Sequence, residues 1–243
     1  MLKVKNLSFT VTDENNRQNT IVNDVSFEIA DGEMVVITGP NGGGKSTLAK
    51  LIMGIEKSTS GEIYLDDKNI TDFSIDERAN AGIGFAFQQP PRFKGMTIRR
   101  FLSLSAGKEL KEDKCCEILS TVGLCAREYV NRQVDATLSG GEMKRLEIAS
   151  AMAKNHSICI YDEPEAGIDL WSFSMLVKLF EKLHKEKKQS IINISHQERI
   201  IKMADRIMVL KDGKINNIGE ANKVMPQLFM QDMGCACLNN HKC

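Results

Sequence analysis

Several features that would narrow the class of this 243-residue protein are absent from its sequence. Its 32 Lys and Arg residues are balanced by 32 Asp and Glu residues, so it lacks the basic excess of a nucleic-acid-binding surface. No apolar run approaches the roughly 20 residues that cross a bilayer, and we expect neither a membrane span nor a secretory signal. Aromatic residues are scarce, at 6%, but the apolar fraction of 42% is that of a folded chain rather than a disordered one.

Cysteine is the unusual residue, with seven copies and therefore an odd number. An odd count without a visible secretory signal favours reduced thiols, so we expect a cytoplasmic protein. Cys235, Cys237, His241 and Cys243 place four soft potential ligands within nine residues of the C-terminal tail. Their spacing matches no specific metal-ligand pattern. An unpacked tail with exposed thiols is the favoured interpretation, and metal binding there stays open.

The first quarter of the chain predicts strands followed by a strand–loop–helix unit. Residues 2–11 and 21–29 alternate apolar and polar side chains, as half-buried strands do. Residues 34–38 form a continuous apolar run, which is typical of a strand buried on both faces. A glycine-rich turn over residues 39–44 follows, and residues 45–55 have helical periodicity.

The middle of the chain is helical and interrupts an α/β pattern. Residues from about 96 to 155 contain helical patterns and few strand signals, so we expect an inserted helical lobe at about 88–155. The α/β pattern resumes with a buried strand at 157–161 and an amphipathic helix from about 170 to 187. Two further strands are expected at 190–194 and 206–210.

The segment Gly39-Pro40-Asn41-Gly42-Gly43-Gly44-Lys45-Ser46 matches the pattern G-x-x-x-x-G-K-[ST]. Glycines allow consecutive backbone N–H groups to turn inward around phosphate oxygens, and the following helix directs its positive end at the same anion. Lys45 can reach the β- and γ-phosphates, and the Ser46 hydroxyl can coordinate Mg²⁺. A strand before the loop and a helix after it are the required context, so we expect a nucleotide triphosphate site here.

Two acidic residues, Asp162 and Glu163, end the buried strand at 157–161. In open α/β sheets the carboxyl ends of strands face the ligand crevice. We expect Asp162 to hold Mg²⁺ and Glu163 to polarise the water that attacks the γ-phosphate.

A second anion site is expected at the start of a helix after Leu138-Ser139-Gly140-Gly141-Glu142. Ser139 is a suitable N-cap residue, and the two glycines expose backbone N–H groups at the helix start. This site lies in the expected lobe, so it need not meet the glycine loop within one chain.

Taken together and in this order, these motifs resemble those of the ATP-binding cassette ATPases over about residues 1–220. The resemblance adds Gln88 after the strand Gly84–Phe87, the loop Ala166-Gly167-Ile168-Asp169, and His196 after the strand at 190–194. It implies an α/β P-loop NTPase core with an N-terminal antiparallel β layer and an inserted helical subdomain. The cassette domain would cover residues 1–225, with the lobe at about 88–155, and a cysteine-rich tail would follow at 226–243.

The resemblance also implies Mg²⁺-dependent ATP hydrolysis and a role for each motif residue. Glu163, His196 and Gln88 would be catalytic, and Ser46, Gln88 and Asp162 would hold the Mg²⁺. The residues expected to bind ATP are Gly39, Pro40, Asn41, Gly42, Gly43, Gly44, Lys45, Ser46, Thr47, Ser139, Gly140, Gly141 and Asp169. Two chains would form a head-to-tail dimer, with each ATP between the glycine loop of one chain and Ser139–Gly141 of the other.

The partner driven by this ATPase is expected from smaller resemblances. Ser139-Gly140-Gly141-Glu142-Met143-Lys144-Arg145 is similar to the SGGEKKR stretch of the Suf-type iron–sulfur cluster assembly ATPases, whereas transporter cassettes more often have Gln in place of Glu142. Ala86–Pro90 resembles the Suf AFQ-x-P segment, and Val11 is aliphatic where transporter cassettes place an adenine-stacking aromatic. Pro164, in contrast, is transporter-like.

We therefore expect a divergent Suf-type ATPase that acts on a soluble scaffold subunit. The alternative is the cytosolic ATP-binding subunit of a membrane transporter, peripheral to the membrane and docked on a permease. DNA-repair cassettes need a long coiled-coil insertion and translation cassettes need two cassettes in one chain, and neither feature is present, so we expect no nucleic-acid partner. The purine preference stays open because the expected stacking position is aliphatic.

Overall fold

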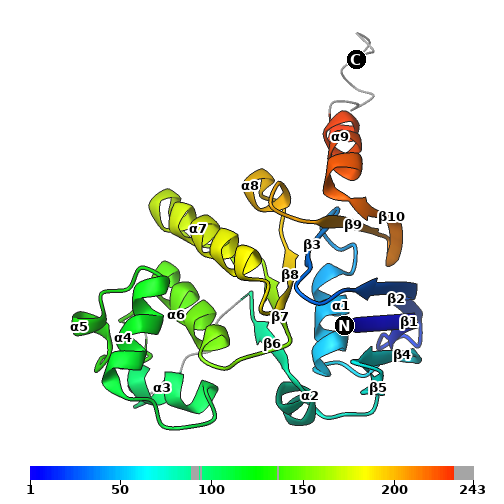
Figure 1. The fold of residues 1–243 in the computed structure, drawn as a ribbon. Coiled ribbons are helices and arrows are strands. Elements are labelled where there is room, and N and C mark those ends of the chain that lie inside the picture. Colours follow the sequence, from blue (N-terminus) through cyan, green and yellow to red (C-terminus); the bar gives the residue numbers. More distant parts are fainter. Residues whose placement is uncertain (89–92, 94, 136, 233–243) are drawn as a thin grey trace.

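The protein is described by a computed structural model that covers residues 1–88, 93, 95–135 and 137–232. The strands in this part of the chain form two sheets, one of four strands and one of six, and the helical lobe lies to one side of them (Figure 1). The expected metal-ligand candidates Cys235, Cys237, His241 and Cys243 lie outside the described residues, as do Gln89 and Pro90.

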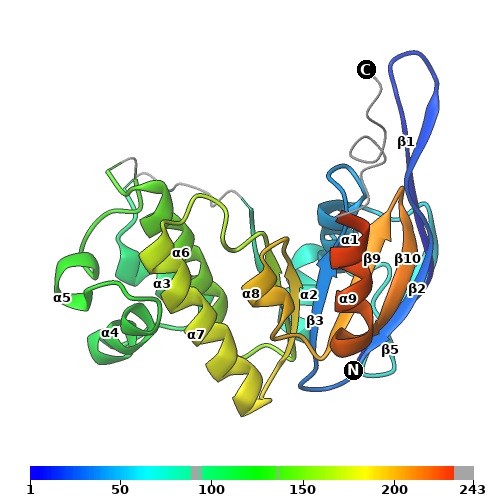
Figure 2. The ribbon, with the colours of Figure 1, turned by 90° about the horizontal axis from the view of Figure 1, so that it is seen from above.

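The smaller sheet is antiparallel and has the strand order β2-β1-β4-β5. Its members are β1 (Leu2–Thr12), β2 (Gln18–Ile29), β4 (Ser60–Leu65) and β5 (Lys68–Asn69). The first two extend the alternating segments expected from the sequence. Their paired ends form a long hairpin that projects beyond the rest of the sheet (Figure 2).

The larger sheet has the order β10-β9-β3-β8-β7-β6 and is parallel except for β10. Its strands are β3 (Met34–Thr38), β6 (Ile83–Ala86), β7 (Ile158–Asp162), β8 (Ser190–Ile194), β9 (Arg206–Lys211) and β10 (Lys214–Glu220). Every residue of β3, β7 and β8 is buried, as their continuous apolar runs predict.

The faces of this sheet belong to two different cores because successive side chains of a strand point to opposite faces. In β3, Val35 and Ile37 pack with the smaller sheet and with α1 (Lys45–Met53). Met34 and Val36 pack on the other face, where the helical lobe and the later helices lie. Helix α1 therefore lies between the two sheets (Figure 1).

The lobe contains α3 (Ile98–Ser105), α4 (Glu112–Thr121), α5 (Ala126–Tyr129) and α6 (Gly140–Met152). All four lie within the span expected to be helical. The lobe is joined to the large sheet through α6, which packs beside β6.

The remaining helices are α2 (Ile75–Ala81), α7 (Leu170–Glu186), α8 (Glu198–Ile201) and α9 (Ala221–Asp232). Helix α7 has the bounds that its apolar stripe predicts, to within one residue. The expected boundary between residues 225 and 226 falls inside α9. Among the described residues, no helix is both long enough and apolar enough to cross a membrane.

Candidate functional site

The glycine loop, residues 39–46, connects β3 to α1 and is shaped by close backbone contacts. A Cβ atom on Gly39 would lie 2.1 Å from the carbonyl oxygen of Leu210, and one on Gly43 would lie 2.8 Å from the same oxygen. Gly44 has φ of +95°, and its Cβ would lie 2.7 Å from the carbonyl oxygen of Ile21. Strands β9 and β2 therefore exclude any side chain from these positions, which leaves the loop backbone free to face a ligand.

Lys45 is almost fully buried beneath the loop that precedes it. Its Nζ donates hydrogen bonds to the carbonyl oxygens of Gly39, at 2.8 Å, and Pro40, at 2.9 Å. Burial lowers the pKa of this ammonium, and the carboxylates of Glu163 and Asp162 oppose that shift. Burial makes the positive charge of Lys45 unfavourable on its own, so an anion bound beside it would stabilise the charged ammonium.

Ser46 and Asp162 join the start of α1 to the end of β7. The Ser46 hydroxyl donates to Oδ1 of Asp162 at 3.0 Å. Asp162 is buried, and burial raises the pKa of its carboxyl group. A hydroxyl and a carboxylate are the oxygen ligands that Mg²⁺ takes in nucleotide sites, so these two residues fit the expected metal.

Glu163 follows Asp162 in a left-handed backbone conformation, with φ of +46°. Such a φ is unfavourable for a residue with a side chain, and strain of this kind persists only where surrounding contacts impose it. Here the backbone N–H of Glu163 donates to the carbonyl oxygen of Ile194 at 3.0 Å, and Nε2 of Gln88 donates to Oε2 of Glu163 at 2.6 Å. These contacts direct the carboxylate toward the glycine loop, where it lines a cleft.

His196 lies two residues beyond the end of β8 and is exposed. Partial burial of its ring and the nearby Lys45 lower its pKa, while Glu163 acts in the opposite sense. The imidazole is therefore neutral at neutral pH and can donate one hydrogen bond. The structure brings His196, Lys45 and Glu163 into mutual electrostatic range.

A cleft of about 370 Å³ opens beside these residues. Its lining consists of Asn19, Ile21, Asn41, Gly42, Gly43, Gly44, Lys45, Ser46, Thr47 and Glu163. Asn19 and Ile21 of β2 were not expected from the sequence, because nothing local in a strand indicates which loop it will cross. Val11, at the expected stacking position, pairs with Asn19 in the hairpin. A larger cavity of about 620 Å³ lies away from this cleft, among α4, α6 and α7.

The expected second anion site, Ser139–Gly141, forms the first turn of α6, and we call it the signature turn. Ser139 caps the helix through a reciprocal capping box with Glu142. A Cβ on Gly140 would meet no atom within 4 Å, and one on Gly141 would lie 3.7 Å from the carbonyl oxygen of Gly167. Among the described residues, no side chain or backbone atom requires glycine at Gly140, and the signature turn is not part of the cleft lining.

Asp169, which the resemblance implies binds ATP, caps α7. Its carboxylate accepts from the backbone N–H groups of Trp171 and Ser172, each at 3.0 Å, and from the Ser172 hydroxyl at 2.6 Å. These hydrogen bonds lower its pKa. Trp171, which follows in the first turn of α7, is 83% exposed.

Two buried charged residues of α6 were missed by the sequence analysis. Nζ of Lys144 donates to the carbonyl oxygens of Phe87, of Gln88 at 3.2 Å and of Asp162 at 3.3 Å. Oε1 of Glu147 accepts from the backbone N–H of Phe87, and its other oxygen lies 3.8 Å from Nζ of Lys144. The pair therefore fixes the backbone that leads to Gln88 and the end of β7.

Burial decides the electrostatics of this pair. The Lys144 side chain is only 1% exposed, and burial lowers its pKa. Burial raises the pKa of Glu147 to about 7, against the opposing effect of Lys144. One feature of the sequence could have indicated this pair. Lys144 and Glu147 are three residues apart among apolar positions of α6, and this spacing places both on the face that packs against the sheet.

Four cysteines lie among the described residues. Cys115 is buried in the lobe and its neighbour Cys116 is partly exposed. All four described cysteines, which include Cys125 and Cys159, are free thiols.

Comparison with known proteins identifies the relatives of this chain. The family model for ABC transporters matches residues 22–166. An uncharacterized ABC transporter ATP-binding protein of Methanocaldococcus jannaschii is 39% identical over 212 residues, which are 84% of each chain. A sulfate/thiosulfate import ATP-binding protein of Synechocystis is 32% identical over 84% of this chain and 58% of its own length.

A solved structure gives the same result for the fold. It is a dimeric ATP-binding cassette in a post-hydrolysis state, bound to ADP and phosphate, with a TM-score of 0.82. Its sequence is 28% identical, and the match covers 91% of this chain and 99% of the other.

Proposed function

Because the chain belongs to the ABC transporter family of ATP-binding proteins, we propose that it is an ATPase subunit that drives movement in a separate partner subunit. The family uses ATP with Mg²⁺, and the fold is that of its cassettes. The observation that carries the proposal is the grouping of Lys45, Ser46, Asp162, Gln88 and Glu163 at one edge of the large sheet.

Each residue of this group has a defined task in phosphoryl transfer. Lys45 and the inward-facing loop backbone would bind the β- and γ-phosphates. Ser46 and Asp162 would hold Mg²⁺, which neutralises developing charge on the phosphate oxygens. The Glu163 carboxylate would accept the proton of the attacking water, with Gln88 orienting it. The His196 N–H would stabilise the charge of the γ-phosphate.

Complete sites would need two copies of the chain. The signature turn contributes N–H groups at a helix start, yet it lies outside the cleft that the glycine loop forms. In the part of the chain that the structure describes, no contact requires glycine at Gly140, which supports contact with another molecule at that turn. A head-to-tail pair would place the signature turn of one copy on the triphosphate held by its mate, and Asp169 near the contact. The solved relative is itself dimeric.

The relatives favour a membrane transporter as the partner complex. Both curated relatives described above are transporter ATP-binding proteins, and one imports sulfate or thiosulfate. We therefore propose a permease subunit as the partner, with the cassette at the membrane surface. The imported or exported substrate is not encoded in this chain, because a cassette of this family contacts the permease rather than the cargo.

A Suf-type scaffold for iron–sulfur cluster assembly is the second candidate. It is favoured by the stretch Glu142-Met143-Lys144-Arg145, because transporter cassettes more often have Gln in place of Glu142. Lys144 of this stretch is buried and donates to three carbonyl oxygens, including that of Asp162, so the stretch reaches the site from α6. The aliphatic Val11 at the stacking position supports the same candidate.

Co-purification from the source cells separates the two candidates. The tagged Glu163→Gln protein, loaded with Mg-ATP, is the bait, and Lys45→Ala is the control that should not retain nucleotide. Recovery of a multi-span membrane protein supports transport, and recovery of a soluble scaffold supports cluster assembly. ATP hydrolysis by the purified wild-type chain tests the activity itself, and its absence together with absent ATP binding would contradict the proposal.

A further inference from the structure

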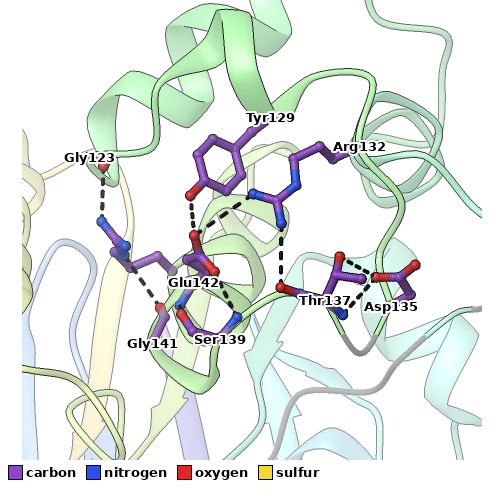
Figure 3. A network of polar contacts seen from close by, with 9 residues as sticks. Gly123, Tyr129, Arg132, Asp135, Thr137, Ser139, Gly141 and Glu142 are labelled. Atoms are coloured by element: carbon purple, nitrogen blue, oxygen red, sulfur yellow. Dashed lines mark hydrogen bonds and ion pairs between the residues drawn. The ribbon is translucent and has the colours of Figure 1, made fainter.

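We propose that Tyr129 and Arg132 are positioning residues that hold and neutralise the Glu142 carboxylate, so that the signature turn of α6 can accept a triphosphate. The inference rests on the proposed ATP-bound dimer. It assigns a task to a polar network in the helical lobe that the catalytic group of the cleft does not use (Figure 3).

The signature turn carries a negative charge, that of Glu142, close to the N–H groups that would bind a phosphate. A helix N-terminus attracts an anion because its first N–H groups are unpaired and the helix dipole is positive there. Glu142 sits in that first turn, three residues after the cap. Its negative charge stabilises the isolated helix, but it also repels any phosphate that approaches Gly140 and Gly141.

Three groups surround this carboxylate. Oε2 accepts from the backbone N–H of Ser139 at 2.7 Å, and Oε1 accepts from the Tyr129 hydroxyl. Nη1 of Arg132 lies 4.0 Å from the same Oε1 atom. The hydrogen bond from Tyr129 is the main cause of the lowered pKa of Glu142, so the carboxylate is ionised and needs a compensating charge.

Arg132 supplies that charge and is itself held in place. Its guanidinium lies 4.8 Å from the centre of the Tyr129 ring, in a cation–π contact, and Nη2 donates to the Thr137 carbonyl oxygen at 3.4 Å. Thr137 is fixed in turn by two hydrogen bonds to Asp135, at 2.9 and 2.7 Å. The arginine therefore comes from the segment that leads into the signature turn and folds back on the carboxylate (Figure 3).

The Glu142 side chain is 19% exposed and that of Arg132 is 36% exposed. Charges at this depth are only partly screened by water, so pairing them changes the potential at the helix start. The Tyr129 hydroxyl and the Arg132 guanidinium both act on Oε1 of Glu142. They thereby reduce the negative potential that Glu142 exerts at the N–H groups of Gly140 and Gly141, which would contact the phosphate.

A double-mutant cycle tests the proposal through dimerisation rather than folding. In the hydrolysis-deficient Glu163→Gln background, Arg132→Ala should weaken ATP-induced dimerisation about five- to tenfold, as expected for one uncompensated charge near an anion. ATP binding to the monomer, which uses the glycine loop, should be unchanged. Adding Glu142→Gln removes the charge that Arg132 balances, so Arg132→Ala should then change dimerisation by less than about twofold.

Matched variants separate charge compensation from general effects. Arg132→Lys keeps the positive charge and should retain most of the dimerisation, while Arg127→Ala removes an exposed positive charge from α5 and should have no effect. Tyr129→Phe keeps the ring beneath the guanidinium but removes the hydroxyl donor, so it should weaken dimerisation only while Glu142 is present. Thermal melts of each variant identify any loss of folding, and Tyr129→Phe serves as the test if Arg132→Ala does not fold.

Two results would overturn the inference. One is unchanged dimerisation of Arg132→Ala. The other is that Arg132→Ala weakens dimerisation equally with and without Glu142→Gln. A failure of the Glu163→Gln protein itself to dimerise with ATP would instead contradict the proposed dimer, so the two failures are distinguishable.

Discussion

The side-chain amide of Gln88 donates a hydrogen bond to Oε2 of Glu163 across 2.6 Å. Gln88 comes two residues after the end of β6 and Glu163 one residue after the end of β7, and these are neighbouring parallel strands. Lys144 of α6, in the helical lobe, donates to the carbonyl oxygen of Gln88 at 3.2 Å, and the proposed dimer would bring this lobe to its mate. A displacement of the lobe would therefore move the group that orients the expected base.

Glu163→Gln should bind ATP but hydrolyse it at least about a hundredfold more slowly, because an amide cannot accept the proton of the attacking water. The hydrogen bond from Gln88 is retained by the new amide oxygen, so the site geometry should persist. Gel filtration with saturating Mg-ATP should show a dimer, which for the wild type would be transient. A monomeric elution of the variant would count against the sandwich arrangement.

His196→Ala should reduce turnover about ten- to a hundredfold while the dissociation constant for ATP changes by less than about twofold. The reason is that a neutral imidazole N–H gains most when negative charge develops on the γ-phosphate. Steady-state hydrolysis and equilibrium titration with ATP measure the two quantities. His184→Ala is the matched control, because His184 pairs with Asp205 outside the site. Unchanged turnover of His196→Ala would remove this residue from the mechanism.

Lys144→Met should destabilise the fold by about 3–5 kcal/mol, because it leaves Glu147 and three carbonyl groups without their cationic partner. Adding Glu147→Leu should restore much of that stability, since paired buried charges can often be replaced together. Turnover should stay low in the double variant because the backbone that leads to Gln88 is no longer fixed. Urea unfolding and ATP hydrolysis measure the two effects. Recovery of turnover along with stability would show that the pair has only a structural role.

Burial lowers the pKa of His156 from 6.5 to about 4, and its Nδ1 has no hydrogen-bond partner in the described part of the chain. A depressed histidine pKa contributes stability above pH 6.5, and this contribution is lost as the pH falls toward 4. His156→Phe keeps a ring beside Gly84 but cannot be protonated. Between pH 7 and pH 5 the wild type should therefore lose about 1–2 kcal/mol more unfolding free energy than the variant.

Urea unfolding at the two pH values provides the measurement for His156. Burial raises the pKa values of Asp162, Glu165 and Glu147, which favours stability on acidification, but these groups are the same in both proteins. The difference between the two proteins isolates the histidine. Parallel pH profiles would show that the His156 ring is protonated in the folded state as easily as in the unfolded chain.

The motifs were predictable because each is formed by residues that are consecutive in the sequence. The glycine loop requires glycines close together in the sequence. Strands β3, β7 and β8 are recognisable as continuous apolar runs, which is the pattern of strands buried on both faces. The acidic end of β7 then follows from the general rule for parallel sheets. Helix α1 ends two residues earlier than expected, since Gly54 adopts a left-handed cap with φ of +80°.

What the sequence did not predict depends on contacts between distant segments. Strands β4 and β10 do not alternate regularly between buried and exposed residues, so their sequences lack the period of a strand. Their places in the two sheets depend on pairing with β1 and β9. Asn19 lines the cleft only because β2 crosses the glycine loop. The Lys144–Glu147 pair and the Tyr129–Glu142 contact require the tertiary fold, because a charged residue in a helix is read from the sequence as solvent-facing.

The open space beside Gly140 has a consequence for how this chain should tolerate change. Gly140 has no positive φ, and a methyl group there would touch none of the described residues, so Gly140→Ala should melt at or above the wild-type temperature. If a second copy presses a nucleotide against that spot, the same alanine should abolish turnover. Thermal stability and activity would then change in opposite directions at this single position. A mutational survey that measured folding alone would score Gly140→Ala as harmless, although it would be among the substitutions most damaging to function.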